Sequence, residues 1–421
     1  MIAFVAGLFS KYRMANWALA DQAMVSGTNF LTGILIARYL GLEEFGRFTL
    51  AWMTVTFFCS LQFAVIVSPM MSIAPKQSSR ELVYYWGAVF LQQVVWVVAS
   101  ALMLLSLLWV SVGVFPQWEI KGIISPLVFA LIAFQIQDFF RRYFFSTLRP
   151  HLAFLNDSVS YLGQLGVLIV LFQYTEPSTP DVLWVIAISS FVAAGIALFS
   201  VRPFKFSRRV VIKVVSQHWK FSRWLLASAL LQWTSGYNFF LAVAGIMLGA
   251  MEVGAIKAAQ NIIGLANILF MAMENFVPGR AAKIFIGEGM VGLIKYLKKI
   301  AVGGGLATGV LAIVAIFFAD TLMGLLYGEK YAIYSDLLQW FGVIYMLIFF
   351  SLPIGAGLRA LEKTQSLFTS LLWMTGFSVL SVYPLIEWMG IYGVMLGIIV
   401  VRSGVLLILF NDFGRQAEIC R

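Results

Sequence analysis

Charged side chains occur inside segments of this chain that are otherwise apolar and long enough to cross a lipid bilayer. In the first of these segments Asp21 is followed by Thr28 and Thr32 at steps of seven and four residues, with Asn29 beside them. Such steps place side chains on one face of a helix. An ionisable group at the bilayer centre costs about 2.5–3.5 kcal/mol on insertion scales, so Asp21 is predicted to line a cavity. Hydroxyls and single amides such as Asn29 fit either cavity lining or hydrogen bonding between helices.

A second polar face follows helical spacing between residues 257 and 275. Its members are Lys257, Gln260, Asn261, Gly264, Asn267, Met271, Glu274 and Asn275. The preceding apolar segment carries Ser228, Gln232 and Ser235 on one face. Lys257 and Glu274 are predicted to line a cavity because a buried charge is costly, whereas the amides fit either role.

Arginines occur in two further apolar segments. Asp138 lies three and four residues before Arg141 and Arg142, so it can pair with either guanidinium within one helix. These arginines either snorkel to the inner interface or form a cationic mouth for a phosphate-bearing substrate, since guanidinium binds phosphate through two hydrogen bonds. Arg402 has no charged residue in its neighbouring turns. It either snorkels to the interface or faces the cavity, and we favour the cavity.

No arrangement of residues in the sequence predicts a catalytic, cofactor or metal site. The stretch GGGLATG from Gly303 lacks the Gly-Lys-Ser/Thr ending of a phosphate-binding loop. Cys59 and Cys420 have neither a CxxC partner nor metal-ligand spacing, and His151 and His218 lie far apart in basic loops, where we expect them to be solvated. We therefore predict a protein that is not an enzyme and that needs no cofactor or metal.

Composition indicates which solvent the chain is built for. Hydrophobic residues make up 61% of the 421 residues and charged residues 11%, whereas soluble domains carry about a quarter charged residues. The net charge of +10 is spread in short clusters between apolar segments, which argues against a nucleic-acid surface and for a membrane protein.

Twelve segments meet the length of about 20 apolar residues that a bilayer-spanning helix needs. They are approximately Asn16 to Leu40, Phe45 to Met71, Leu82 to Phe115, Ile123 to Ser146, Ala153 to Gln173, Val182 to Val201, Phe221 to Leu248, Val253 to Val277, Leu297 to Ala319, Ile333 to Leu352, Gln365 to Ile386 and Met389 to Phe410. We therefore predict an all-α polytopic membrane protein.

The distribution of Lys and Arg predicts the orientation of the chain. With the N-terminus in the cytoplasm, only five of the 29 basic residues fall toward the outer side, namely Arg38, Arg47, Lys121, Lys257 and Lys330. This asymmetry places both termini in the cytoplasm. The basic connection at residues 202–220 has apolar residues at helical spacing, which is typical of a helix lying on the inner leaflet.

The two halves of the chain resemble each other. Aligning Gly41 with Gly249 also aligns Glu44 with Glu252, Gly46 with Gly254 and Ala51 with Ala259, at a constant offset of 208, and Pro69 and Pro278 follow at an offset of 209. Each half contains six predicted spans, so the repeats share one orientation. We predict two six-helix bundles, residues 1–210 and 211–421, with a substrate path between them.

Two short stretches also resemble a known family. LIARYLGLEEFGRFTLA, from Leu35, resembles the opening hairpin of bacterial polysaccharide-export and O-antigen flippases, and LLYGEKY, from Leu325, resembles a recurring turn of that family. The family belongs to the multidrug/oligosaccharidyl-lipid/polysaccharide (MOP) superfamily, with the multidrug/toxin extruders and the lipid II flippase. Lipid II flippases usually have fourteen spans, whereas twelve are predicted here.

This resemblance implies a flippase of the bacterial cytoplasmic membrane that moves a polyprenyl-pyrophosphate-linked oligosaccharide by alternating access. The expected partners are the lipid-linked oligosaccharide, membrane lipids and a polysaccharide polymerase, and Asp21 and Glu274 are candidates for binding a coupling proton or sodium ion. The first alternative is a cation-coupled multidrug extruder. The second is a membrane glycan polymerase, although no outer connection exceeds about a dozen residues, which is short for a domain that carries out catalysis.

Overall fold

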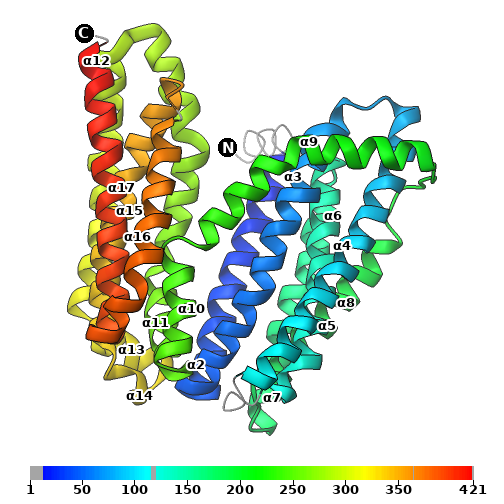
Figure 1. Cartoon of the computed structure of the whole chain (residues 1–421), viewed down its shortest axis with the longest axis horizontal. Helices are drawn as coiled ribbons and strands as arrows, with labels where there is room; N and C mark the ends of the chain where they lie inside the picture. The colour runs from blue at the N-terminus through cyan, green and yellow to red at the C-terminus, as the bar shows by residue number, and fades with distance from the viewer. Residues whose placement is uncertain (1–12, 115–119, 364, 420–421) are drawn as a thin grey trace, which may run out of the picture. The chain divides into compact units, whose positions relative to one another are not determined.

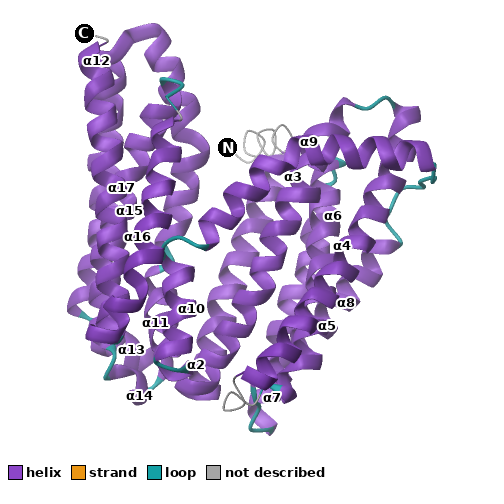
Figure 2. Cartoon of the chain, viewed as in Figure 1, coloured by secondary structure: helices purple, strands orange, loops and turns teal. Residues whose placement is uncertain are grey.

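A computed structural model describes residues 13–114, 120–363 and 365–419 of the chain. Within these ranges the regular elements are all helices, and no strand occurs (Figure 1, Figure 2). The chain divides into two compact units: unit 1 comprises the described residues up to Leu40 together with Ala51–Leu230, and unit 2 comprises Gly41–Leu50 together with the described residues from Leu231 onward. The predicted border after residue 210 falls near the start of α9, Arg208–Trp233, most of which lies in unit 1.

Unit 1 contains the helices of the first half of the chain, apart from residues 41–50 and the last three residues of α9, which belong to unit 2. These are α2 (Arg13–Gln62), the π-helical turn η1 (Phe63–Val67), α3 (Ser68–Ile73), η2 (Ala74–Lys76), α4 (Ser79–Val114), α5 (Lys121–Ser146), α6 (Pro150–Asp157), the π-helical turn η4 (Ser158–Leu162), α7 (Gly163–Tyr174), α8 (Thr179–Leu198) and α9. Local sequence sets some of their ends. A capping box of Ser178 and Asp181 starts α8, with Pro180 in its first turn, where the missing N–H costs nothing.

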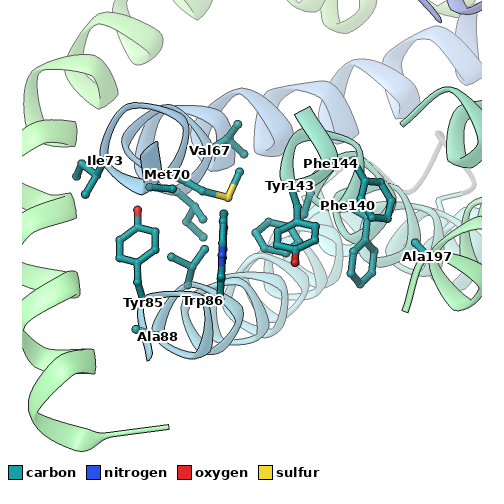
Figure 3. Packing of buried hydrophobic residues seen from close by; sticks show 14 of the residues in the cluster. Val67, Met70, Ile73, Tyr85, Trp86, Ala88, Phe140, Tyr143, Phe144 and Ala197 are labelled. Carbon is teal, nitrogen blue, oxygen red and sulfur yellow. The ribbon is translucent and has the colours of Figure 1, made fainter. Parts of the chain in front are cut away.

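An aromatic cluster forms the core at one end of unit 1. The ring of Trp86 on α4 lies between those of Tyr85 and Tyr143, with centroid distances of 5.7 Å and 4.7 Å and edge-on geometry (Figure 3). Phe140 and Phe144 extend the cluster along α5. Edge-to-face aromatic pairs contribute about 0.5–1.5 kcal/mol each beyond the area they bury. The cluster therefore fixes α4 against α5 and against the end of the second predicted span.

Unit 2 contains the helices of the second half of the chain. These are α10 (Tyr237–Met247), α11 (Ala250–Ile263), α12 (Ala266–Phe317), α13 (Ala319–Tyr327), α14 (Glu329–Ala332), α15 (Ser335–Ala360), α16 (Gln365–Met389) and α17 (Ile391–Ile419). Helix α12 contains a break at Gly289, whose φ of 65° belongs to the left-handed region. The residues before this break belong to the eighth predicted span and to the connection that follows it, and those after it lead into the ninth span.

Nine helical segments of the described residues are long and apolar enough to cross a membrane. The first of them, Asn16–Lys76, contains both of the first two predicted spans, which join at Gly41. The seventh and eighth predicted spans are each divided into two helices: α9 gives way to α10 at Gly236, and α11 gives way to α12 around Gly264. The chain is therefore a multi-pass membrane protein, and two of its predicted spans are interrupted at mid-length.

The backbone supports the internal repeat. Gly41 and Gly249, which occupy equivalent positions, have φ values of 79° and 115° and ψ values of 177° and −180°. A side chain is strained in this conformation, so glycine is required at both turns. Gly46 and Gly254 are also equivalent, and they face each other: a Cβ added to Gly46 would lie 3.0 Å from the Gly254 nitrogen, and one added to Gly254 would lie 3.1 Å from the Gly46 nitrogen. The same turn therefore forms twice, and its two copies touch through glycine.

Helix α9 packs on the rest of unit 1 through one narrow face. Its buried residues Val214, His218 and Ser222 recur at steps of four, and the Ser222 hydroxyl donates a hydrogen bond of 3.2 Å to the carbonyl of Val65. His218 is 1% exposed and lies 2.9 Å from the Tyr85 hydroxyl. The expectation that His218 is solvated was therefore wrong, because the apolar stripe of the amphipathic helix turns the imidazole inward. His151, on α6, is exposed as expected.

Candidate functional site

The charged residues of unit 1 meet in a buried triad. Arg141 on α5 contacts Asp21 on α2 and Asp157 at the end of α6: its Nη2 donates a hydrogen bond of 2.9 Å to Asp21 Oδ2, and its Nε lies 2.7 Å from Asp157 Oδ2. The side chains of Asp21 and Asp157 are 1% and 0% exposed, and that of Arg141 is 12% exposed. Two carboxylates thus share one guanidinium, which leaves one net negative charge when both are ionised. A buried group of this kind is costly unless the charge is balanced, so the triad favours the uptake of one cation or one proton.

Amides hold one carboxylate of the triad in place. Gln137 donates a hydrogen bond of 2.7 Å to Asp157 Oδ1, and Asn156 donates one of 3.3 Å to the carbonyl of Gln137. The other carboxylate keeps a buried oxygen, Asp21 Oδ1, that accepts no hydrogen bond from any described residue. Asp21 and Asp157 lie within hydrogen-bonding reach of each other, so their two carboxyl groups can share one proton.

The neighbouring acidic residue forms a separate pair. Asp138 accepts a hydrogen bond of 3.3 Å from Arg142, four residues further along α5, and the Arg142 guanidinium lies 5.3 Å from the centre of the Phe63 ring. Both side chains are partly exposed. Of the two pairings open to Asp138 from sequence, the structure forms the one with Arg142, because Arg141 is directed to Asp21 and Asp157.

In unit 2 the polar groups gather near the helix interruptions. At the first interruption the backbone nitrogen of Gly236 donates a hydrogen bond of 3.0 Å to the Ser378 hydroxyl on α16. Close to the second, Asn267 donates one of 3.4 Å to the Tyr345 hydroxyl on α15. Interrupted helices inside a membrane protein expose backbone polar groups only where they are buried in protein or line a cavity, and in transporters they form substrate and ion sites.

Two cations of unit 2 have no acidic partner among the described residues. Arg402 on α17 interacts electrostatically with Tyr345, and its Nε is buried without a hydrogen-bond acceptor. Lys257 on α11 is half-buried, and its Nζ donates a hydrogen bond of 2.8 Å to the side-chain oxygen of Gln260. Neither residue forms an ion pair with a carboxylate in the described ranges. These two cations thus contrast with the triad of unit 1, in which the carboxylates outnumber the guanidinium.

The other predicted site residues are distributed more widely. Asn261 is half-buried and hydrogen bonded to the Tyr327 hydroxyl within unit 2. Asn29, Gln232 and Glu274 are exposed on their own units. Their contribution to a cavity stays a prediction.

Sequence reasoning missed Asp157 as a member of the site. It lies in the fifth predicted span, in the sequence LNDS, and an ionisable residue in an apolar span is by itself a reason to expect function. The contact with Arg141 joins α5 to the end of α6, and only the folded chain reveals it.

No family model and no curated protein sequence matches the chain. Solved structures do match. An inward-facing multidrug-resistance MATE family transporter of the MOP superfamily superposes with a TM-score of 0.71 at 15% identity, covering 93% of this chain and 94% of the transporter. The lipid II flippase MurJ, in an inward closed conformation, gives 0.65 at 14% identity over 95% of this chain and 87% of MurJ.

A third similar structure is a MOP superfamily transporter from Pyrococcus furiosus that is described as having a binding pocket of reversed polarity. It gives a TM-score of 0.63 at 14% identity over 96% of this chain and 95% of that transporter. These three neighbours are transporters or flippases, and the prediction of an all-α membrane protein with about twelve helices is confirmed at the level of the fold. This chain therefore has the twelve-helix fold of the MOP superfamily transporters.

Proposed function

We propose that the protein is a flippase that moves a polyprenyl-pyrophosphate-linked oligosaccharide across the bacterial cytoplasmic membrane, with both chain termini in the cytoplasm. The observation that carries this proposal is the pair of cations in unit 2, Lys257 and Arg402, which have no acidic partner among the described residues. A pyrophosphate group supplies the negative charges that these residues lack. Arginine binds phosphate through a planar fork and lysine as a point charge, so both suit this ligand.

The interrupted helices support the same substrate. Around Gly236 and Gly264 the backbone of two predicted spans leaves its regular helical hydrogen bonding, which provides polar groups at the depth that a pyrophosphate and sugars must cross. The lipid tail stays in hydrocarbon throughout, so the protein needs to provide polar surface only for the headgroup. A cell-surface polysaccharide pathway, with a polymerase acting on the product, is the setting in which such a substrate arises.

The triad of unit 1 is suited to driving the cycle. Deprotonated, it carries one net negative charge around Arg141, and one proton taken up by Asp21 or Asp157 neutralises it. A carboxylate that changes its charge inside a membrane changes the energy of its surroundings by several kcal/mol. Proton binding at the triad is therefore our proposal for the coupling step. Glu274 remains a second candidate for this role.

The test uses proteoliposomes that contain the full-length protein and a polyprenyl-pyrophosphate oligosaccharide, and the readout is the fraction of glycan accessible to an external lectin. Lys257→Gln and Arg402→Gln should each lower the rate of transfer at least tenfold. Lys295→Gln, which removes an exposed cation of α12 outside the interruptions, should leave it unchanged. Transfer that is equally fast in all three variants contradicts the proposal.

A cation-coupled multidrug extruder is the second candidate, and the acidic triad is the observation that favours it. The two carboxylates of Asp21 and Asp157 share one guanidinium, that of Arg141. The excess negative charge would attract a cationic drug. Cells that express the protein would then tolerate organic cations such as tetraphenylphosphonium better than cells expressing an Asp21→Asn variant. The same cells would show an unchanged pool of lipid-linked glycans when the protein is depleted.

A further inference from the structure

An apolar groove lies in unit 2 between α12, α15 and α17. It encloses about 460 Å³ and is partly open to the exterior. Its lining residues are apolar with one exception, Lys298 on α12. Leu297 and Ala301 share its face of that helix, Phe350 lies on α15, and Leu407 and Phe410 lie on α17. The groove has the size of a small-molecule site. Its surface is wholly apolar, so Lys298 lines it with the methylene stem of its side chain and not with its ammonium.

Aromatic and basic side chains border the groove. The Phe350 ring lies 3.5 Å from the position of a Cβ at Gly305, so it packs against α12 one turn beyond Ala301. Lys298 lies between the lining residues Ile294 and Ala301 and is exposed, and the exposed cations Lys295 and Lys299 are its neighbours on the same helix. An apolar groove with cations at its border matches an acyl chain that carries an anionic headgroup.

The predicted topology places this groove beside the lipids of the inner leaflet. In the predicted topology Lys298 lies at the cytoplasmic end of the ninth span, at the depth of the inner-leaflet phosphates. Leu407 and Phe410 are 61% and 64% exposed, so hydrocarbon reaches the groove from its open side. Basic pockets between transmembrane helices on the cytoplasmic side bind phosphate headgroups, and each cation near an anionic lipid surface contributes about 1 kcal/mol.

We propose that the groove binds one acyl chain of an anionic phospholipid of the inner leaflet, with Lys298 against its phosphate. This site is separate from the polar residues at the helix interruptions. The proposal depends on the membrane location of the chain and not on what it transports. Its failure would therefore leave the proposed flippase function untouched, and failure of the flippase assay would leave the groove untouched.

The test uses the full-length protein in vesicles that contain phosphatidylglycerol with a diazirine in one acyl chain, in parallel with the matching phosphatidylcholine. Photolysis followed by peptide mass spectrometry reports which residues the chain contacts. We expect cross-links in residues 294–301, 350–354 and 406–413, with about a fivefold preference for phosphatidylglycerol, which corresponds to about 1 kcal/mol from one lysine.

Two matched pairs of variants separate the groove from its surroundings. Ala301→Trp fills the groove and should remove these cross-links, whereas Val302→Trp, at an exposed position one residue along α12, should retain them. Lys298→Gln should abolish the headgroup preference without altering the packing, whereas Lys299→Gln, which does not line the groove, should preserve it.

Three results would overturn the proposal. One is cross-links spread evenly over the lipid-facing helices, and another is equal labelling by both headgroups in the unsubstituted protein. The third is stronger labelling by a diazirine-bearing polyprenyl phosphate than by phosphatidylglycerol, which would assign the groove to the tail of the transported lipid.

Discussion

Substitution of Gly254 by alanine tests whether the two turns of the repeat hold unit 2 together. A Cβ at this position would lie 3.1 Å from both the Gly46 nitrogen and the Leu42 carbonyl carbon, and closer still to the Leu42 oxygen. These are backbone atoms, which cannot rotate away, so the two helices must separate. Overpacking of this kind costs about 1–3 kcal/mol, and we place this case at the upper end. Alanine recovers about 1 kcal/mol of helix propensity, so the net loss should be about 2 kcal/mol.

The assay is unfolding of the purified protein in mixed micelles of increasing SDS fraction, followed by tryptophan fluorescence. Gly27→Ala is the matched control, because nothing lies within 4 Å of a Cβ there, and it should stabilise by up to about 1 kcal/mol. The Gly46→Ala variant should be as unstable as Gly254→Ala, since its Cβ meets the Ala250 backbone. The double variant should lose less than the sum of the two, because one separation relieves both clashes. Equal stability of Gly254→Ala and Gly27→Ala, or strict additivity in the double variant, would refute the reasoning.

Three further predictions concern charge and topology. Burial lowers the pKa of His218, which lies outside the predicted spans, from 6.5 to about 4. Between these two pH values the unfolded chain binds a proton that the folded chain does not, so the free energy of unfolding should fall by up to about 3 kcal/mol between pH 7 and pH 4. The His218→Gln variant should lack this pH dependence. Arg141→Leu leaves two buried carboxylates unbalanced and should lower the free energy of unfolding by about 3–5 kcal/mol in the same assay. Arg402→Leu removes a cation without an acidic partner and should lower it by less than about 1 kcal/mol. Equal losses in the two variants would contradict this assignment of partners. In a cysteine-free background, an impermeant maleimide should label Glu176→Cys in intact cells and Lys363→Cys only after the membrane is opened, and the reverse pattern would invert the predicted topology.

Hydropathy and glycine chemistry predicted much of the fold. A run of about 20 apolar residues is a local property of the chain, so the lengths of the spans could be read without tertiary information. The repeat could be found because Gly41 and Gly249 need a backbone that other residues adopt only with strain. The interruptions at Gly236 and Gly264 were not foreseen, because an apolar composition is unchanged when a helix stops and restarts within it.

The site was harder to predict than the fold. Asp21, Arg141 and Arg402 were identified because an ionisable side chain in an apolar span is costly and therefore usually has a partner or a function. Their partners depend on contacts between distant segments: Asp157 meets Arg141 from another helix, and Tyr345 meets Arg402. His218 was misjudged because charged neighbours in the sequence suggested a solvated loop, whereas the helix turns that one residue toward Tyr85.

The membership of residues 41–50 in unit 2 bears on how the protein is made. Gly46 leaves the ribosome 208 residues before Gly254, the residue it contacts, and synthesis at about 5–20 residues per second separates the two by about 10–40 seconds. During that interval Gly46 lacks the contact that Gly254 provides in the folded chain. Unit 2 is thus assembled from one of the earliest and many of the latest parts of the chain, so translation speed and insertion chaperones should influence its yield more than that of unit 1.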